Sequence, residues 1–114
     1  MGQHNVEYFG DHEYMMFDNA YDPSAGTFVG DSRLLVVQVD EVAATATVVW
    51  EYKLGYNSSV YGDNDRLPTG NLLGSGWPGR PTANTTFDAQ IVEVVRETGE
   101  LAWSAEVYGD NRQG

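Results

Sequence analysis

The sequence Val-Tyr-Gly-Asp-Asn occurs twice in this chain, at residues 60–64 and again at residues 107–111. A longer similarity accompanies it, because the segment from Val37 to Trp50 reads like the segment from Val92 to Trp103. An ungapped alignment of the N-terminal stretch with the middle of the chain places His4 over Gly62. These recurrences indicate two copies of one structural unit. We expect the first copy at about residues 1–56 and the second at about residues 57–114.

Each copy contains four short segments rich in β-branched and aromatic residues, and turn-forming residues separate them. No window keeps apolar residues at helical spacing for more than a turn, so the pattern favours strands throughout. The predicted strands are Gln3–Phe9, Tyr14–Phe17, Leu34–Val39 and Ala46–Tyr52, then Ser59–Leu67, Asn71–Leu73, Ala89–Val95 and Leu101–Val107. The predicted turns are Gly10–Asp11, Asp40–Ala43, Pro68–Gly70 and Glu97–Glu100.

A four-stranded antiparallel unit that recurs at roughly 40 to 60 residues is typical of a β-propeller blade. A propeller needs at least about four blades to close, so two blades belong to a larger ring or assemble with other copies. We therefore predict an all-β chain of two four-stranded antiparallel blades, forming one partial propeller domain over residues 1–114. The alternative is a small two-sheet sandwich with accidental repeats, which would bind carbohydrate through exposed Tyr56, Tyr61 or Trp77.

Charge and composition exclude several functional classes. The net charge is -11, from 17 acidic and 6 basic residues, and the basic residues are scattered singly. Such a surface repels phosphate backbones and anionic lipids, so we expect no nucleic-acid partner. The N-terminus lacks the pattern of a signal peptide, and no apolar run is long enough for a membrane span. The absence of cysteine excludes disulfides and thiolate chemistry.

No sequence motif for a nucleotide or a metal is present. The chain has no P-loop, no dinucleotide-binding glycine pattern, and only two histidines. Asp63-Asn64-Asp65 together with Asp18 would suggest calcium, but these residues lack the ligand spacing of an EF-hand loop and are more typical of turns. We therefore expect no cofactor and no metal.

A series of short motifs resembles the arylsulfotransferase (arylsulfate sulfotransferase) family over nearly the whole chain. Each motif alone is unspecific, but they occur in the family's order and at fitting intervals. They are Gln3-His4, Phe17-Asp18-Asn19, Ser32-Arg33, Val49-Trp50-Glu51-Tyr52 and Arg66-Leu67-Pro68-Thr69-Gly70-Asn71.

The resemblance implies a six-bladed propeller, of which this chain would form two blades. It implies transfer of a sulfuryl group from a phenolic sulfate ester to a phenol, through a histidine that is transiently sulfated. The small-molecule partners would be the phenolic sulfate donor and the phenol acceptor, and the protein partners would be the remaining blades or further copies of the chain. A secreted, periplasmic or secretory-pathway location is also implied. The alternative is a non-catalytic propeller segment that serves as a binding or scaffold module.

The resemblance also assigns two candidate catalytic residues. His4 matches the histidine of the Gln-His motif, which in the family binds sulfate or handles a proton, and Arg33 matches an arginine with a possible anion contact. An imidazole and a guanidinium suit a sulfuryl group, because donors stabilise charge on its oxygens and arginine grips oxyanions in a bidentate manner. The structural alternatives are a hydrogen-bonded strand histidine and a strand-edge charge.

The sulfated histidine of the family comes from a later strand, so we expect it outside this chain and expect the isolated chain to be inactive. His12 falls in a predicted turn and has no counterpart in the family. Asp18 and Asn19 are expected to cap the second strand, and Arg66 is expected to bridge the blades through Asp63 or Asp65.

Overall fold

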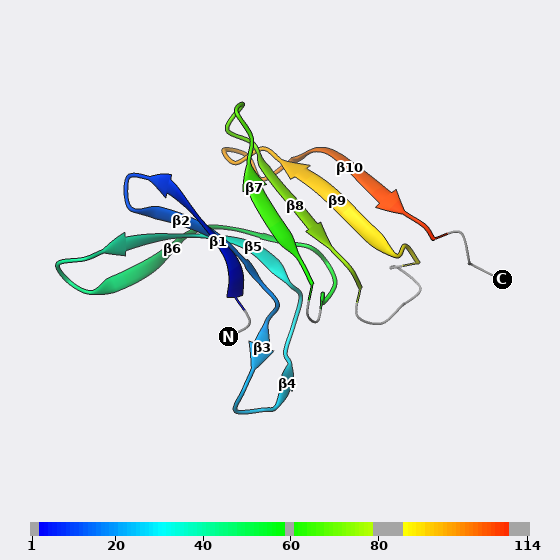
Figure 1. Cartoon of the computed structure of the whole chain (residues 1–114), viewed down its shortest axis with the longest axis horizontal. Coiled ribbons are helices and arrows are strands. Elements are labelled where there is room, and N and C mark those ends of the chain that lie inside the picture. The colour runs from blue at the N-terminus through cyan, green and yellow to red at the C-terminus, as the bar shows by residue number, and fades with distance from the viewer. Residues whose placement is uncertain (1–2, 59–60, 79–85, 110–114) are drawn as a thin grey trace.

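The computed structural model describes residues 3–58, 61–78 and 86–109, which form strands and no helix (Figure 1). Two four-stranded sheets and one two-stranded ribbon are present, and all neighbouring strands are antiparallel. The first sheet contains β1 (Gln3–Gly10), β2 (Glu13–Asp18), β5 (Arg33–Asp40) and β6 (Thr45–Lys53), in that order. The second contains β7 (Asp63–Arg66), β8 (Leu72–Gly76), β9 (Ala89–Val94) and β10 (Leu101–Val107). The ribbon pairs β3 (Tyr21–Asp22) with β4 (Thr27–Phe28).

Each four-stranded sheet is a meander built from one continuous part of the chain, and the two sheets exchange no strand. This connectivity is that of propeller blades, whereas most β-sandwiches use Greek-key connections between their sheets. The predicted all-β fold with two four-stranded antiparallel sheets is therefore confirmed. No helix in the described residues could cross a membrane.

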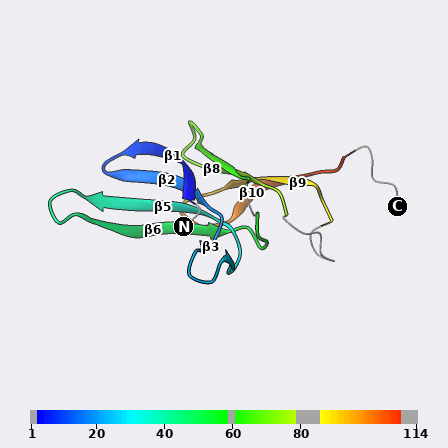
Figure 2. The same cartoon turned by 60° about the horizontal axis from the view of Figure 1, so that its bottom comes forward.

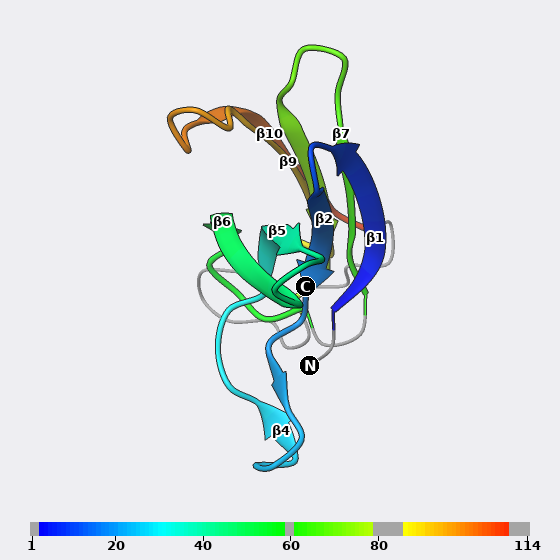
Figure 3. The same ribbon diagram turned by 90° about the vertical axis from the view of Figure 1, so that its left-hand side faces the viewer.

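The ribbon and β7 differ from the sequence prediction; β7 is the inner strand of the second sheet, as β1 is the inner strand of the first. The ribbon of β3 and β4 was not predicted, and it extends away from both sheets (Figure 3). Its strands are only two residues long, which is too short to show an alternating pattern. The second inner strand was predicted over Ser59–Leu67 and is observed over Asp63–Arg66, and residues 59–60 lie outside the described residues.

The core lies between the two sheets (Figures 1 and 2). Alternate residues of each strand point to opposite faces, and the facing positions are apolar on both sides. Seven side chains there are no more than 1% exposed: Met15, Phe17, Leu34 and Val36 from the first sheet, and Leu72, Val92 and Val94 from the second. Gly74 permits close approach of the sheets, because a Cβ atom at this position would lie 2.6 Å from Cδ2 of Leu34.

Two polar contacts join the sheets at the end far from residue 3. The indole Nε1 of Trp50 donates to the carbonyl oxygen of Arg96 at 3.0 Å. The Arg96 guanidinium forms a two-pronged ion pair with Glu13, at 2.8 Å from Nη1 to Oε1 and 2.9 Å from Nη2 to Oε2. The hydrogen bond from Arg96 holds the pKa of Glu13 below its ordinary value of 4.5.

The two sheets share an irregularity in their last hairpin, β5–β6 in the first sheet and β9–β10 in the second. The pairing of β5 with β6 shifts directly after Trp50 pairs with Val36, and the pairing of β9 with β10 shifts beside Trp103. A β-bulge therefore lies next to the same tryptophan in both copies.

The position of His4 is repeated less simply. His4 pairs with Phe17, and the bulge before Glu7 adds one residue to β1 that β7 lacks. The structural counterpart of His4 is therefore Asp63, which pairs with Ser75, whereas the ungapped alignment had placed His4 over Gly62.

Candidate functional site at the seam of the inner strands

His4 lies at the beginning of β1, where this strand runs beside β7 of the second sheet (Figure 3). Its half-buried ring packs against Phe17, with the ring centroids 5.4 Å apart and the rings tilted by 41°. The ring nitrogen Nε2 lies 2.9 Å from the carbonyl oxygen of Gly62. His4 therefore belongs to the seam between the two sheets, on the face that contains the core.

The Gly62 carbonyl oxygen is the shared hydrogen-bond acceptor of this seam. It also accepts a hydrogen bond from Nδ2 of Asn5, at 2.8 Å. Asn5 has a φ of 56° within the bulge of β1, a conformation that asparagine adopts more readily than most residues. A side chain at position 62 would collide with Phe17, because a Cβ atom there would lie 2.3 Å from Cε1 of the ring. Glycine at position 62 is thus required for the contact between His4 and the second sheet.

The contact with Gly62 also determines which ring nitrogen of His4 carries a proton. A carbonyl oxygen can only accept, so the proton on this side of the ring lies on Nε2. In the neutral ring the basic nitrogen is then Nδ1. The Gly62 carbonyl therefore acts as the group that orients the imidazole.

A pair of carboxyl groups lies farther along the same seam. Glu7 pairs with Met15 on the core-facing side of β1, and its neighbour across the seam is Asp65 of β7. Burial raises the pKa of Glu7, and the negative charge of Asp65 raises it further. The backbone N–H and the charge of Arg66 act in the opposite direction without cancelling this effect. Glu7 therefore holds its proton at higher pH than an ordinary glutamate.

Arg66 joins the two sheets, as expected, but by different contacts. Its guanidinium carbon lies 4.7 Å from the centroid of the Phe9 ring, and Nη1 donates to the Phe9 carbonyl oxygen at 3.4 Å. Among the described residues no ion pair links Arg66 with Asp63 or Asp65, so that part of the prediction was wrong. Asp65 instead lies within hydrogen-bonding reach of Glu7 across the seam.

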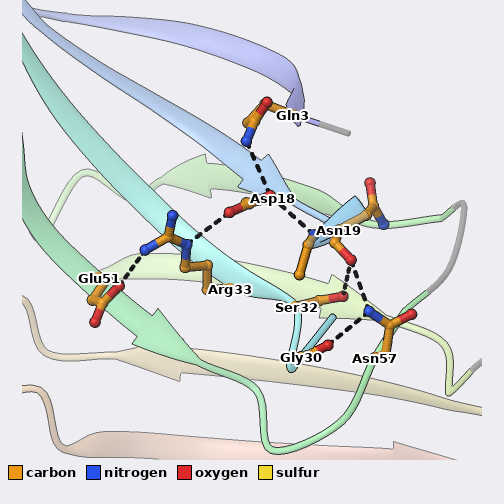
Figure 4. A network of polar contacts seen from close by, with 9 residues as sticks. Gln3, Asp18, Asn19, Gly30, Ser32, Arg33, Glu51 and Asn57 are labelled. Carbon is orange, nitrogen blue, oxygen red and sulfur yellow. Dashed lines mark hydrogen bonds and ion pairs between the residues drawn. The ribbon is translucent and has the colours of Figure 1, made fainter. Parts of the chain in front are cut away.

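Arg33 lies on the opposite face of the first sheet from His4. It stands in one cross-strand row with Asp18 and Gln3, whereas His4 belongs to the next row, with Phe17 and Leu34. Nε of Arg33 lies 2.7 Å from Oδ2 of Asp18, and Nη1 lies 2.5 Å from Oε2 of Glu51 (Figure 4). The structure therefore does not bring the two candidate catalytic residues together.

The ion pairs of Arg33 outweigh the cost of its burial. Burial lowers the pKa of the guanidinium, but the hydrogen bonds with Asp18 and Glu51 raise the pKa above its ordinary value. Arg33 borders a shallow hollow of about 360 Å³, together with Gln3, Tyr21 and Lys53. Nε and Nη1 are already paired with two carboxylates, so an anion in this hollow would be left with the Nη2 end of the guanidinium and would be repelled by both carboxylates.

A buried polar network connects Asp18 with the segment that leads to Gly62 (Figure 4). Asp18 accepts from the backbone N–H of Ala20 at 3.0 Å, which agrees with its expected capping role. Asn19 donates through Nδ2 to the carbonyl oxygen of Ser58 and, at 3.3 Å, to that of Tyr61. Ser32 receives a hydrogen bond from the Ser58 backbone N–H at 2.7 Å. The Phe-Asp-Asn and Ser-Arg motifs thus hold the chain directly before Gly62.

Two exposed aromatic rings lie at the same end of the sheets as His4. Tyr61 precedes Gly62 directly, and its ring lies 4.3 Å, centroid to centroid, from that of Trp77. Tyr61 is 58% exposed and Trp77 is 50% exposed. Tyr56, which the sandwich alternative placed on the surface, is instead 7% exposed and packs edge-on against Phe87.

His12 is far from this seam. With Asp11 it forms the two-residue turn between β1 and β2, and the φ angles of 52° and 63° are those of a type I′ hairpin. The prediction that His12 is a turn residue is confirmed. Within residues 3–58, 61–78 and 86–109, no three His, Cys, Asp or Glu side chains gather as a metal site would require.

The seam residues Gly62, Asn5 and Asn19 were not predicted as part of the site. Their contacts with one another and with His4 span up to 58 positions of the chain, so no local pattern reveals them. The signal that was available is the position of Asn19 in the Phe-Asp-Asn motif, which marks it as part of the same motif series as His4.

Comparison with known proteins gives one result. No curated protein and no solved structure matches the chain. The family model described as arylsulfotransferase (ASST) matches residues 1–113. Together with the all-β sheets and the ordered motifs around His4, this match shows that the chain belongs to the arylsulfotransferase family.

Proposed function

We propose that the protein containing this chain transfers a sulfuryl group from a phenolic sulfate ester to a phenol. Family membership over residues 1–113 is the observation that carries this proposal. The two sheets would be adjacent blades of a six-bladed ring. A histidine outside this chain would attack the sulfur of the donor, the bond from sulfur to the phenolic oxygen would break, and the phenolate would leave. The acceptor phenol would then lose its proton and take the sulfuryl group from the histidine.

In this reaction we assign proton handling to His4. A phenolate that leaves needs a proton, and a phenol that attacks must give one up, so one imidazole near the sulfur serves both half-reactions. The hydrogen bond from Nε2 to the Gly62 carbonyl oxygen supports this role, because it fixes the orientation of the ring and the nitrogen that carries the proton.

The substrates require a surface for a phenolic ring. The exposed pair of Tyr61 and Trp77 stands beside the residue that orients His4, and aromatic rings pack well against one another. We assign to this pair the contact with the ring of the donor or the acceptor. Arg33 stays a prediction as an anion contact, because two of its three guanidinium nitrogens, Nε and Nη1, are engaged by Asp18 and Glu51.

The test uses the full-length protein, phenol as the acceptor, and an aryl sulfate donor whose own phenol is coloured once it is released. The rate of transfer is measured from the release of that coloured phenol. We expect His4→Gln to lower kcat by roughly 100-fold or more, because general acid and base catalysis contributes about 10² to 10⁴. His12→Gln is the matched control and should keep the activity of the unaltered protein, because His12 lies in the turn at the other end of β1.

The alternative is a non-catalytic blade pair, and one observation favours it. Both candidate residues have structural contacts that account for their presence, His4 with Gly62 and Arg33 with two carboxylates. If the His4→Gln variant retains full turnover while the thermal unfolding temperature of the protein falls, the role of His4 is structural. If the full-length protein shows no transfer from any aryl sulfate, the binding or scaffold role stands instead.

A further inference from the structure

Two consecutive side chains of β1 reach the same atom. Nε2 of His4 lies 2.9 Å from the Gly62 carbonyl oxygen, and Nδ2 of Asn5 donates to that oxygen at 2.8 Å. Consecutive side chains of a regular strand point to opposite faces, so a fully extended β1 would direct these two away from each other. The φ of 56° at Asn5 breaks this alternation. The backbone of Asn5 therefore brings its amide to the seam beside the histidine.

The irregular backbone at Asn5 belongs to the β-bulge of β1. The register of β1 with β2 shifts between His4 and Glu7, where β1 has one more residue than β2. Bulges next to functional sites often re-aim a side chain. The second sheet shows that a blade does not need this bulge, since β7 pairs with β8 over Asp63–Arg66 without a register shift. The bulge therefore accompanies a feature that the first inner strand has and the second lacks, and the histidine is such a feature.

The two side chains together use the full accepting capacity of the Gly62 carbonyl oxygen. A carbonyl oxygen has two lone pairs, and His4 and Asn5 each donate to this one. The Phe17 ring limits the seam on another side, because it packs on the His4 ring and leaves no room for a side chain at position 62. Asn5 thus holds in place the atom that orients the imidazole.

We propose that Asn5 is a positioning residue for His4 in sulfuryl transfer. Its amide holds the Gly62 carbonyl oxygen, and this oxygen holds the imidazole in one orientation. A fixed orientation allows the ring to give a proton to the leaving phenolate and to take one from the attacking phenol. Asn5 acts through His4 and does not itself touch the reacting atoms. This inference rests on the proposed function, because it requires that His4 handles the proton.

The first experiment measures kcat and KM for transfer from an aryl sulfate to phenol in the full-length protein. Asn5→Gly removes the amide and keeps a residue that accepts a positive φ, so the bulge can persist. We expect kcat to fall roughly tenfold with KM nearly unchanged, because a lost hydrogen bond changes an equilibrium by about two- to tenfold. Asp11→Gly is the matched control and should keep full activity, since Asp11 has a similar φ of 52° in the turn at the other end of β1.

The second experiment separates positioning from direct contact with the substrate by a double-mutant cycle. In the His4→Gln background, Asn5→Gly should lower the residual kcat by less than about twofold, because the ring that Asn5 positions is then absent. A direct contact of Asn5 with the substrate would produce the same loss with and without His4, and that result would overturn the inference.

The third measurement does not depend on turnover. In the full-length protein with ¹⁵N-labelled histidine, the imidazole signals of His4 are identified by their loss in His4→Gln. Asn5→Gly should shift the Nε2 resonance and speed the exchange of its proton with water, whereas Asp11→Gly should leave both unchanged. Circular dichroism confirms that the variants are folded.

The outcomes separate this inference from the proposed function. A protein that transfers no sulfuryl group but shows the expected change at Nε2 would refute the proposed function and still support the orientation of His4 by Asn5. Unchanged His4 resonances in folded Asn5→Gly would overturn the inference. Full activity of Asn5→Gly in a protein that loses its activity on His4→Gln would overturn it as well.

Discussion

At the scale of single residues, the seam depends on a glycine, Gly62, at a position where any side chain would collide with the first sheet. Gly62 has no side chain, and this absence allows its carbonyl oxygen to reach both His4 and Asn5 beside the Phe17 ring. Asn64, the next residue that faces the first sheet, has buried amide atoms without a hydrogen-bond partner among the described residues. A buried polar group of this kind costs stability, so the seam is not optimised for packing alone.

The first prediction at this scale concerns Gly62→Ala. The added methyl group would overlap the Phe17 ring, so the ring or β7 must move, and the distance from His4 to the position 62 carbonyl oxygen must change. We expect a loss of about 1 to 3 kcal/mol in the free energy of unfolding. The hydrogen bond of His4 should weaken, visible as a shifted ¹⁵N resonance of its imidazole.

The control is Gly26→Ala, in the loop of the β3–β4 ribbon. Gly26 also has a positive φ, of 67°, but a Cβ atom there would meet nothing within 4 Å. Its cost should come from backbone strain alone, and the resonance of His4 should not move. Equal shifts in both variants would show that the Phe17 contact does not control the seam.

At the scale of strands, the ion pair of Glu13 with Arg96 ties the beginning of β2 to the turn that follows β9. Because Arg96 holds the pKa of Glu13 below 4.5, the pair stabilises the fold above that pH and loses this contribution as the pH falls through the lowered pKa. Glu7 acts in the opposite sense, since burial and Asp65 raise its pKa. Its favourable contribution is present below 4.5 and is lost as the pH rises through the raised pKa.

The prediction at this scale is that Glu13→Gln lowers the free energy of unfolding by about 1 kcal/mol at pH 7. The difference from the unaltered protein should shrink as the pH falls from 4.5 through the lowered pKa of Glu13, because both proteins lack the carboxylate below that pKa. Urea unfolding between pH 7 and pH 3 measures this difference. Glu97→Gln, an exposed substitution in the same turn as Arg96, is the control, and a constant difference for Glu13→Gln at all pH values would contradict the role of the ion pair.

At the scale of the whole molecule, the two sheets behave as one packed body because their facing surfaces share a core. Gly74 is a point of close approach within the core, where Leu34 of the first sheet fills the space of the missing side chain. The hydrogen bond from Trp50 to the Arg96 carbonyl oxygen joins the sheets at the end far from His4. His4 and Arg66 contact the opposite sheet at the seam between β1 and β7. The distance between the sheets therefore fixes both the core and the geometry of the site.

We predict that Gly74→Val separates the sheets. The branched side chain would meet Leu34, so we expect a loss of about 2 to 3 kcal/mol in the free energy of unfolding. Ser75→Thr is the matched control, because Ser75 neighbours Gly74 in β8 but points to the outer face. If denaturant unfolding shows equal stabilities for the two variants, the close approach at Gly74 does not limit the packing of the sheets.

Much of the fold could be predicted because its signals are local. Alternation in segments such as Leu34–Val39 predicted the strands, and the paired tryptophans predicted two copies of one unit. The β3–β4 ribbon was missed because two-residue strands carry no period. The bulge at Asn5 was missed because an extra residue is invisible until the pairing of β1 with β2 is known.

The candidate site could be predicted less completely. The motif series identified His4, but nothing in the sequence showed that Arg33 lies on the opposite face of the sheet. That relation depends on the register between β1, β2 and β5, and a shift of one residue would reverse it. The role of Arg33 in binding Asp18 and Glu51 follows from the same register.

The sequence by itself determined that this chain is all β, that it contains one unit twice, and that its motifs are those of arylsulfotransferases. Alternation, turn residues and motif order are properties of neighbouring positions, so they can be read along the chain. Only the tertiary structure decided that His4 is oriented by a carbonyl group 58 residues away and separated from Arg33 by the sheet itself. The physical reason is that contacts between distant residues are set by how the two sheets pack, and that packing depends on the shapes of Phe17, Gly62, Gly74 and Leu34 together.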